Sequence, residues 1–395
     1  MTSLVVPHIT PPSPSSLLLF PPILPTISTM ALFHEPLRFL SSLLTRKNHR
    51  DHFAPHPGVP FEGYYTRILT STGGTIVMIL SSVFGAEEKA HLVHFSYHPS
   101  PSSSSEPLMM ERFPQMTDIP GHLFHGGGVQ EFSRVAKGDG VEGTMRVCRD
   151  EVRYRLEFPQ EQVEVEVDLS SRRTWREGDE ISTPEGALAE LSSLLPLHWD
   201  VFSVCSRATF SLRRGALVET GEGWAHVEKN WGKEFPSGWT WLQGFSHDGR
   251  RCFSFAGGKI LGLRAFLGGY RSERVCWDWH PLTGAVLLGG FGAMTEEVDS
   301  KMGRARFVVP AGWGRKVEVL VQASAEHEGW VGMRCPLREG HGNTFAYETF
   351  DGKVTVRALQ RGWWWWFGGW KVVEETVFEH AAVEFGGDYS FKVRR

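Results

Sequence analysis

Short runs of alternating or wholly apolar residues, separated by turn-forming residues, fill this 395-residue chain from about residue 56 onward. Residues 163–168 alternate Val with Glu or Asp, as a strand does when one face is buried and the other meets solvent. Such runs recur about every 8–12 residues, bounded by Gly, Pro, Ser or Asp, which is typical of β-sandwiches and β-barrels. The sequence therefore predicts an all-β fold. The predicted strands are residues 75–83, 91–97, 143–147, 152–158, 163–169, 201–212, 239–245, 252–255, 264–267, 274–280, 285–290, 304–309, 316–323, 354–359, 370–377 and 381–385.

One helix is predicted, over residues 184–195. Thr183 is a suitable N-cap, and the pattern ends before Pro196. Because this segment lies near the middle of the chain, we expect it to join two β halves. The first half would cover residues 56–195 and the second residues 196–395.

Residues 1–50 differ in composition from the rest of the chain. Their only acidic residue is Glu35, against three Arg and one Lys, and Ser and Pro are frequent. Such a composition is typical of organellar transit peptides, so we expect an intracellular protein of the mitochondrion or plastid, or one at a membrane periphery. An unstructured leader and a translation start at Met30 are the alternatives. No apolar run reaches the roughly 18 residues of a membrane-spanning helix.

Composition excludes several classes of function. The 41 Lys and Arg residues nearly balance the 45 Asp and Glu residues, which gives no support to a nucleic-acid partner. The five cysteines form no C-x-x-C pair and the 17 histidines show no ligand spacing, so we predict neither a disulfide framework nor a metal. No nucleotide-binding motif is present, and no cofactor is predicted. The 15 Trp and 26 Phe residues favour a large β core or an aromatic cavity.

A segment rich in charged, amide and indole groups stands out at residues 227–244. It reads V-E-K-N-W-G-K-E-F-P-S-G-W-T-W-L-Q-G, and we expect a turn followed by a strand. On that strand Trp239 and Trp241 share one face, and Thr240 and Leu242 share the other.

This segment resembles the signature of the tocopherol cyclase family. Three further segments resemble elements of that family in the same order: F-E-G-Y-Y-T-R at 61–67, L-P-L-H-W at 195–199 and A-A-V-E-F-G-G at 381–387. One departure is Thr240, where the family has Phe.

The resemblance implies a fold of two related, lipocalin-like β-barrel halves, similar in scaffold to carotenoid hydratases. It also implies closure of a prenylated hydroquinone to a chromanol without metal or redox cofactor. The partner would be a lipophilic prenylated aromatic molecule. Two alternatives stay open: an isoprenoid hydratase or other cyclase on the same scaffold, and a lipid- or quinone-binding carrier without catalysis. The sequence does not predict an oligomeric state.

Chromanol closure protonates an isolated alkene and captures the resulting cation with a phenol oxygen. Because an alkene is a weak base, the donor should be a carboxyl whose pKa is raised by apolar surroundings. Three carboxyls beside aromatic residues are the candidates: Glu228, as the acid or as a residue that orients it, Glu62 and Asp278. The structural alternative for Glu228 is an ion pair with Lys229 or Arg67. For Glu62 it is an ion pair that anchors a hairpin, and for Asp278 it is a solvent-facing strand position. The expected substrate-binding residues, with Trp rings near the cation, are Lys229, Asn230, Trp231, Trp239, Trp241, Gln243, Tyr64, His198 and Trp199.

Residues 363–366 are four consecutive Trp residues. If they lie on a strand, two must face outward, because successive side chains point to opposite faces. One hypothesis is a lip that rests on a membrane and admits a lipid substrate, since Trp favours membrane interfaces. The alternative is that a second sheet or a partner covers this face.

Overall fold

The computed structural model describes residues 50–391, apart from 101, 122–127, 192–194, 261–262, 282–293, 327 and 363–368. Nearly all of the predicted leader, the predicted strand at 285–290 and the four Trp residues at 363–366 lie outside the described residues. The elements with described bounds are strands and two short 3₁₀ helices, which confirms the all-β prediction. No helix in the described part of the chain has the length and apolar character needed to cross a membrane.

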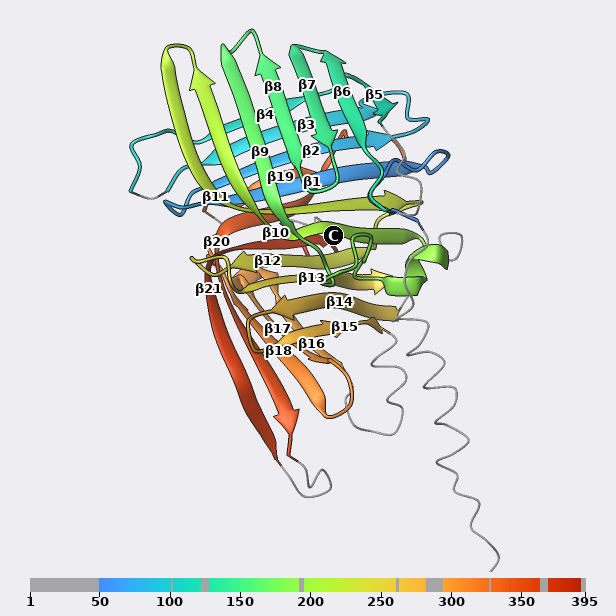
Figure 1. Ribbon diagram of the computed structural model, residues 1–395, viewed down its shortest axis with the longest axis vertical. Helices are drawn as coiled ribbons and strands as arrows, with labels where there is room; N and C mark the ends of the chain where they lie inside the picture. Colours follow the sequence, from blue (N-terminus) through green and yellow to red (C-terminus); the bar gives the residue numbers. More distant parts are fainter. Residues whose placement is uncertain are drawn as a thin grey trace, which may run out of the picture. The chain divides into compact units, whose positions relative to one another are not determined.

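The first sheet is an antiparallel sheet of eleven strands in the order β4-β3-β2-β1-β11-β10-β9-β8-β7-β6-β5, drawn from blue to yellow-green in Figure 1. Because β1 pairs with β11, Phe61 lies opposite Gly232, 171 positions later in the chain. The strands are β1 (Phe61–Thr70), β2 (Thr75–Val83), β3 (His91–His98), β4 (Leu108–Arg112), β5 (Gln115–Pro120), β6 (Phe132–Gly138), β7 (Val141–Val147), β8 (Val152–Phe158), β9 (Val163–Arg173), β10 (Leu197–Arg214) and β11 (Leu217–Gly232).

The second sheet contains ten strands, with the path β15-β14-β13-β12-β21-β20-β18-β17-β16 and β19 paired to β20. The two sheets form the two lipocalin-like halves that the family resemblance implies. The strands are β12 (Gly238–Phe245), β13 (Cys252–Ile260), β14 (Leu263–Arg271), β15 (Cys276–Trp279), β16 (Thr295–Asp299), β17 (Arg304–Pro310), β18 (Arg315–Gln322), β19 (Val331–Arg334), β20 (Thr344–Arg361) and β21 (Trp370–Gly387). A 3₁₀ helix, η2 (Ser300–Met302), joins β16 to β17.

The chain passes from one sheet to the other later than the sequence predicted. The change falls at residues 233–237, not between residues 195 and 196, because β10 and β11 pair with β9 and β1 of the first sheet. Gly232 enables this change. Its φ of 155° lies in the region that favours glycine, and a Cβ there would be 2.3 Å from the carbonyl oxygen of Pro196. Residues 228–231, expected in a turn, are thus the end of β11.

The described part of the predicted helix is not a regular α-helix. It forms a 3₁₀ helix, η1 (Gly186–Leu191), and residues 192–194 lie outside the described residues. The Thr183 hydroxyl donates to the carbonyl oxygen of Trp199 at 3.2 Å, and the Glu185 carboxylate accepts the Trp199 N–H at 2.7 Å. These side chains therefore tie the segment to β10, and this contact competes with a regular α-helix.

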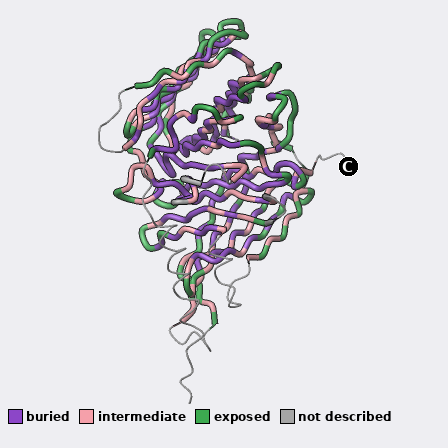
Figure 2. The backbone as a smooth tube through the Cα atoms, turned by 90° about the vertical axis from the view of Figure 1, so that its right-hand side faces the viewer, coloured by how far each residue is buried: buried purple, intermediate pink, exposed green. Residues whose placement is uncertain are grey.

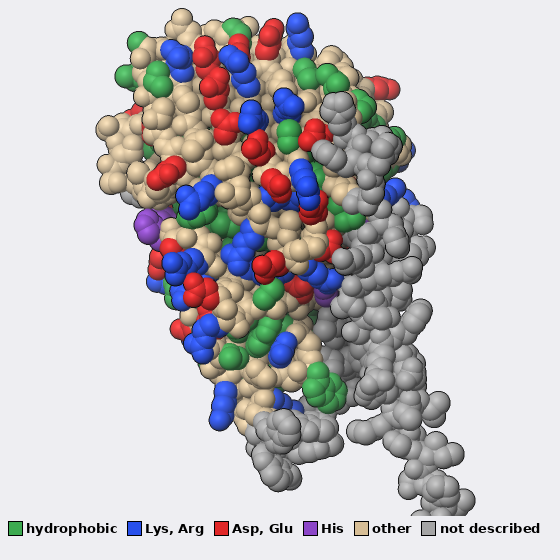
Figure 3. Space-filling view, viewed as in Figure 1, with side chains coloured by type: hydrophobic (Ala, Val, Ile, Leu, Met, Phe, Trp, Pro, Cys, Tyr) green, Lys and Arg blue, Asp and Glu red, His purple; other side chains and the backbone are tan. Residues whose placement is uncertain are grey.

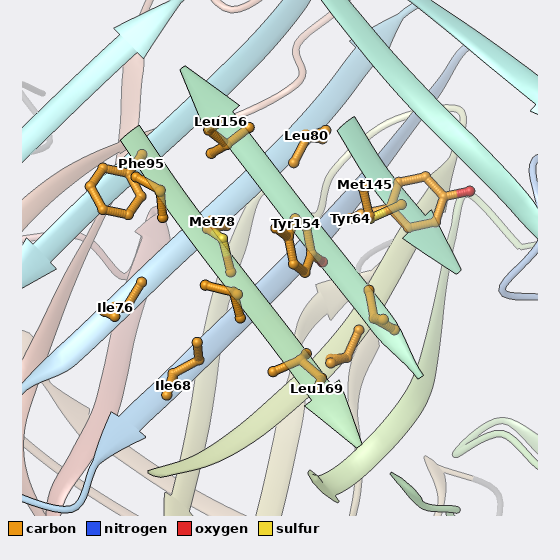
Figure 4. Packing of buried hydrophobic residues seen from close by; sticks show 14 of the residues in the cluster. Tyr64, Ile68, Ile76, Met78, Leu80, Phe95, Met145, Tyr154, Leu156 and Leu169 are labelled. Atoms are coloured by element: carbon orange, nitrogen blue, oxygen red, sulfur yellow. The ribbon is translucent and has the colours of Figure 1, made fainter. Parts of the chain in front are cut away.

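Each sheet encloses its own apolar core. The first core includes Tyr64, Ile68, Met78, Phe95 and Leu156, which converge from strands far apart in the sequence (Figure 4). The second core is rich in aromatic side chains. They include Phe253, Phe255, Phe266, Tyr270, Trp279, Phe307, Phe378 and Phe385. Long stretches of both sheets are buried, as Figure 2 shows in purple.

Successive side chains of a strand point to opposite faces of its sheet. One set therefore faces the core of that sheet, and the other faces the space between the two sheets. On β1, Tyr64 faces the first core, whereas Tyr65 and Arg67 face the second sheet. The Tyr65 hydroxyl donates to Glu348 Oε1 at 2.7 Å, and Arg67 Nη1 donates to Gln243 Oε1 at 2.5 Å. The functional candidates that meet between the sheets come from this second set.

Candidate functional site

A cavity of about 140 Å³ lies between the two sheets. A cavity of roughly 150 Å³ with apolar walls can hold a benzene ring, so this space suits one ring or a short isoprenoid segment. Its wall is largely apolar and aromatic, with a few carboxyl, amide and guanidinium groups. The lining residues are Phe61, Gly63, Tyr64, Tyr65, Ile79, Ser81, Glu185, Leu197, His198, Trp199, Glu228, Asn230, Phe235, Pro236, Trp239, Thr240, Trp241, Ala256, Gly257, Leu267, Met333, Arg334, Cys335, Pro336 and Glu384.

Two strand carboxyls line this cavity, one from each sheet, and a third lies next to one of them on the neighbouring strand. Glu228 lies on β11 of the first sheet, and Glu384 and Glu348 lie on β21 and β20 of the second. Antiparallel pairing places Glu384 opposite Trp241 on β12 and opposite Glu348 on β20. Trp241 in turn contacts the ring of Tyr65, with ring centres 5.0 Å apart and edge-to-face geometry.

Glu384 is the carboxyl that combines access to the cavity with a raised pKa. Its side chain lines the cavity and is half-buried, and its Oε1 accepts the indole N–H of Trp239 at 2.5 Å. Burial raises the pKa of Glu384 to about 7. The hydrogen bond from Trp239 lowers this pKa, whereas the negative charge of Glu228 raises it further. A substantial fraction of Glu384 is therefore protonated near neutral pH.

Glu348 lies behind Glu384 and is completely buried. Burial raises its pKa well above the usual range, and the charge of Glu384 adds to this effect, while the Tyr65 hydrogen bond opposes it. Its Oε2 has no hydrogen-bond partner among the described residues. Like charges directly opposite each other on paired strands are destabilising, so this pair favours at least one neutral carboxyl.

Glu228 has a different environment, because two N–H groups donate to it and a histidine ring nitrogen lies within hydrogen-bond distance. Trp241 Nε1 and His226 Nε2 lie 3.0 and 2.8 Å from its Oε2, and Asn230 Nδ2 lies 3.4 Å from its Oε1. The structural alternative, an ion pair with Lys229 or Arg67, does not appear among the contacts of Glu228. Glu228 therefore lines the cavity with both of its carboxyl oxygens held by hydrogen bonds.

The structure brings about half of the predicted site residues to the cavity. Those lining it are Tyr64, His198, Trp199, Glu228, Asn230, Trp239 and Trp241, whereas Glu62, Lys229, Trp231, Gln243 and Asp278 do not line it. His198 Nδ1 lies 2.7 Å from Glu185 Oε2, and the same carboxylate accepts the Trp199 N–H, so these three residues form one wall.

Glu62 and Lys229 form an ion pair that is buried away from the cavity. Lys229 Nζ lies 2.9 Å from Glu62 Oε2 and also donates to the carbonyl oxygen of Ala54 at 2.5 Å. Arg134 donates to the other oxygen of Glu62. Burial alone would raise the pKa of Glu62, but Lys229 and Arg134 together lower it. Glu62 is therefore poorly suited to donate a proton. It belongs to a structural ion pair, which was the alternative to a catalytic role.

The other three residues away from the cavity also have structural contacts. Trp231 stacks on His56, with ring centres 4.4 Å apart. Gln243 accepts a hydrogen bond from buried Arg67. Asp278 of β15 forms an ion pair with Arg271 at the end of β14.

Sequence reasoning did not select Glu384, Glu348, Tyr65 or His226 as site residues. A signal existed for two of them: Glu384 lies in the segment 381–387 and Tyr65 in the segment 61–67, both of which resemble family elements. Glu348 lies in an ordinary strand sequence, and only the pairing of β20 with β21 reveals its position. No group of three or more His, Cys, Asp or Glu side chains that could hold a metal ion occurs in the described ranges.

Comparison with known proteins gives one family and a set of similar folds. A family model described as tocopherol cyclase-like matches residues 129–387. No curated protein sequence matches the chain.

Several solved structures share the fold. The crystal structure of CghA matches with a TM-score of 0.56 and 8% identity over 87% of this chain and 97% of that chain. CghA with Sch210972 gives 0.54 and 9%, over 87% and 96% of the two chains. A protein assigned as AttH from Nitrosomonas europaea gives 0.50 and 11%, over 86% and 96%. Identities this low show the fold alone.

Proposed function

Because this chain belongs to the tocopherol cyclase-like family, we propose that it closes a prenylated hydroquinone to a chromanol by protonating the alkene of the prenyl chain. A cyclase- or hydratase-type activity on this scaffold follows from the family, and the choice of substrate and reaction is the proposal. The observation that supports it best is Glu384, a half-buried carboxyl with a pKa of about 7 in an aromatic cavity. An acid works best when its pKa lies near the operating pH.

The proposed reaction moves one proton from oxygen to carbon. Glu384 gives its proton to the less substituted alkene carbon, a C–H bond forms, and the tertiary carbon becomes cationic. The phenol oxygen then attacks this carbon, a C–O bond forms, and Glu228 takes the phenol proton. A proton returning from Glu228 to Glu384 restores both groups. The product is an isomer of the substrate, so the balance needs no oxidant, reductant or water.

The residues around the two carboxyls support this division of roles. The rings of Trp239, Trp241 and Tyr65 line the same cavity as Glu384 and Glu228. A π-face stabilises a nearby cation by about 0.5–2 kcal/mol. The apolar wall also limits water, which would otherwise compete with the phenol for the cation. Since the cavity holds about one ring or a short isoprenoid segment, we propose that it takes the reacting end of the substrate while the rest of the tail extends beyond it.

Mass spectrometry after reaction in deuterated water tests the proposal. The full chain is incubated with a phytyl- or geranylgeranyl-benzoquinol. We expect a product of unchanged formula that has lost one phenol and gained one non-exchangeable deuterium on carbon. A product heavier by one water would instead identify an isoprenoid hydratase, and bound but unchanged quinol would identify a carrier without catalysis.

A further inference from the structure

The ends of three strands of the second sheet meet at one extremity of the described chain, at the lower end of the molecule in Figure 1. Arg315 of β18 lies opposite Gln360 of β20, which lies opposite Lys371 of β21. The loop before β18 belongs to the same surface, because the carbonyl oxygen of Gly314 accepts the N–H of Arg361 at 2.9 Å. We call residues 311–316, 359–362 and 369–373 the basic tip.

The basic tip carries positive charge only. It contains Arg315, Lys316, Arg361 and Lys371, and its sequence includes no Asp or Glu. Figure 3 shows blue side chains at this end of the molecule. Acidic residues begin farther along the same strands, and there they have basic or hydroxyl partners. These contacts are Glu318 with Arg306 and Arg357, Glu375 with Arg357, and Glu374 with Arg251 and Tyr270. Charge is thus segregated at the tip and paired elsewhere on these strands.

Apolar side chains are exposed among these cations. Trp313 is 69% exposed and Val372 is 54% exposed. Trp370 is flanked by two cations, with Lys316 Nζ 4.4 Å and Arg361 Cζ 5.5 Å from its ring centre. A single exposed apolar residue has no special meaning, but exposed Trp and Val within a purely basic surface form a specific combination.

We propose that the basic tip docks on the surface of an anionic lipid bilayer. Lys and Arg side chains near an anionic membrane are attracted to its headgroups, and Trp prefers the interface between headgroups and hydrocarbon. The exposed Val372 favours a lipid surface over a nucleic acid, because bases can stack on Trp313 but offer no hydrocarbon to an aliphatic side chain. A second copy of this chain would have to bring acidic groups that the tip lacks. The proposal does not depend on the reaction proposed above.

Co-sedimentation of the full chain with phosphatidylcholine vesicles, with and without phosphatidylserine, tests this proposal. We expect binding to the vesicles that contain phosphatidylserine, and weaker binding as salt rises. Each basic residue contributes about 1 kcal/mol, or about fivefold in affinity, so Arg315→Gln with Lys371→Gln should weaken binding about 25-fold. The matched control is Lys137→Gln with Arg146→Gln, which removes two exposed cations from β6 and β7 of the first sheet. The control should bind as the unchanged chain does.

A second variant tests the apolar part of the surface. Trp313→Ser should weaken vesicle binding at high salt as well as at low salt, because its contribution is not electrostatic. Equal loss in the tip variant and the control would overturn the proposal, since binding would then follow net charge alone. Absence of binding to phosphatidylserine vesicles would also overturn it. So would a dimer in solution that the tip variant abolishes, because the surface would then bind a second copy.

Discussion

Replacing Glu384 with Gln tests the proposed acid with the smallest change in shape. The amide keeps the volume of the side chain and can still accept the Trp239 N–H, but it cannot donate a proton strong enough for an alkene. Loss of a general acid lowers the rate by about 10²–10⁴-fold. This corresponds to about 3–5 kcal/mol in activation free energy.

The same substitution should stabilise the fold at alkaline pH, which separates loss of chemistry from loss of structure. The pKa of Glu384 is about 7 in the fold against 4.5 normally. Because the folded state holds this proton more tightly, stability is lost as pH rises between the two values. Above about pH 7 the cost reaches at most about 3 kcal/mol of unfolding free energy. The Gln variant lacks this cost, so its stability relative to wild type should rise with pH.

Deuterium incorporation under single-turnover conditions measures the chemical step, and denaturant unfolding near pH 5 and near pH 9 measures stability. The wild-type rate should fall as pH rises through about 7, because Glu384 loses its proton there. A Glu384→Gln variant that retains activity within about tenfold of wild type would refute the assignment. Lost activity together with lost stability at both pH values would also count against it.

Three further substitutions test the arrangement around Glu384. Glu228→Gln should lower turnover by about 10²–10⁴-fold, with the unfolding free energy changed by less than about 2 kcal/mol; retained turnover would remove Glu228 as the proton acceptor. Tyr65→Phe leaves Glu348 buried without a described hydrogen-bond partner and should cost about 1–3 kcal/mol in urea unfolding. Its control, Tyr64→Phe, removes a hydroxyl without a described partner and should cost less; equal costs would contradict the role of the hydrogen bond. Lys229→Met breaks a buried ion pair and should cost about 3–5 kcal/mol. The folded fraction of the Lys229→Met variant should keep its activity. Loss of activity with unchanged stability would instead place Lys229 in the reaction.

Strand patterning predicted most of the fold because the signal is local. The predicted ranges 75–83 and 152–158 coincide with β2 and β8, where apolar side chains alternate or the whole run is apolar. Strand β11 was not predicted anywhere along residues 217–232. At residues 228–231 both of its faces are buried and charged residues point to each, so the pattern there does not alternate. The boundary between the two halves was predicted too early in the sequence. It depends on the pairing of β10 with β9 and of β11 with β1, and a local sequence pattern does not show which strands pair.

Residues of the signature separate onto two faces of β11, which explains why only half of its predicted site residues reach the cavity. Glu228 and Asn230 face the cavity, whereas Lys229 and Trp231 pack against Glu62 and His56 on the other side. Consecutive residues of this motif therefore lie in two different places. Alternate residues line the cavity, and the residues between them pack within the first sheet. If residues 228–231 had been predicted as a strand, the alternation of side chains would have separated Glu228 and Asn230 from Lys229 and Trp231.

The position of Glu384 follows from strand pairing alone. It lies 143 positions after Trp241, yet the two are opposite each other because β21 pairs with β12. The same register places Glu348 opposite Glu384 and thus buries two carboxyls on adjacent strands. Such a pair costs stability unless one carboxyl stays protonated. A fold that needed only stability would be better served by an apolar residue at either position. The proposed reaction gives this pair a use, because the pair keeps a proton at the edge of the cavity, where an alkene could take it.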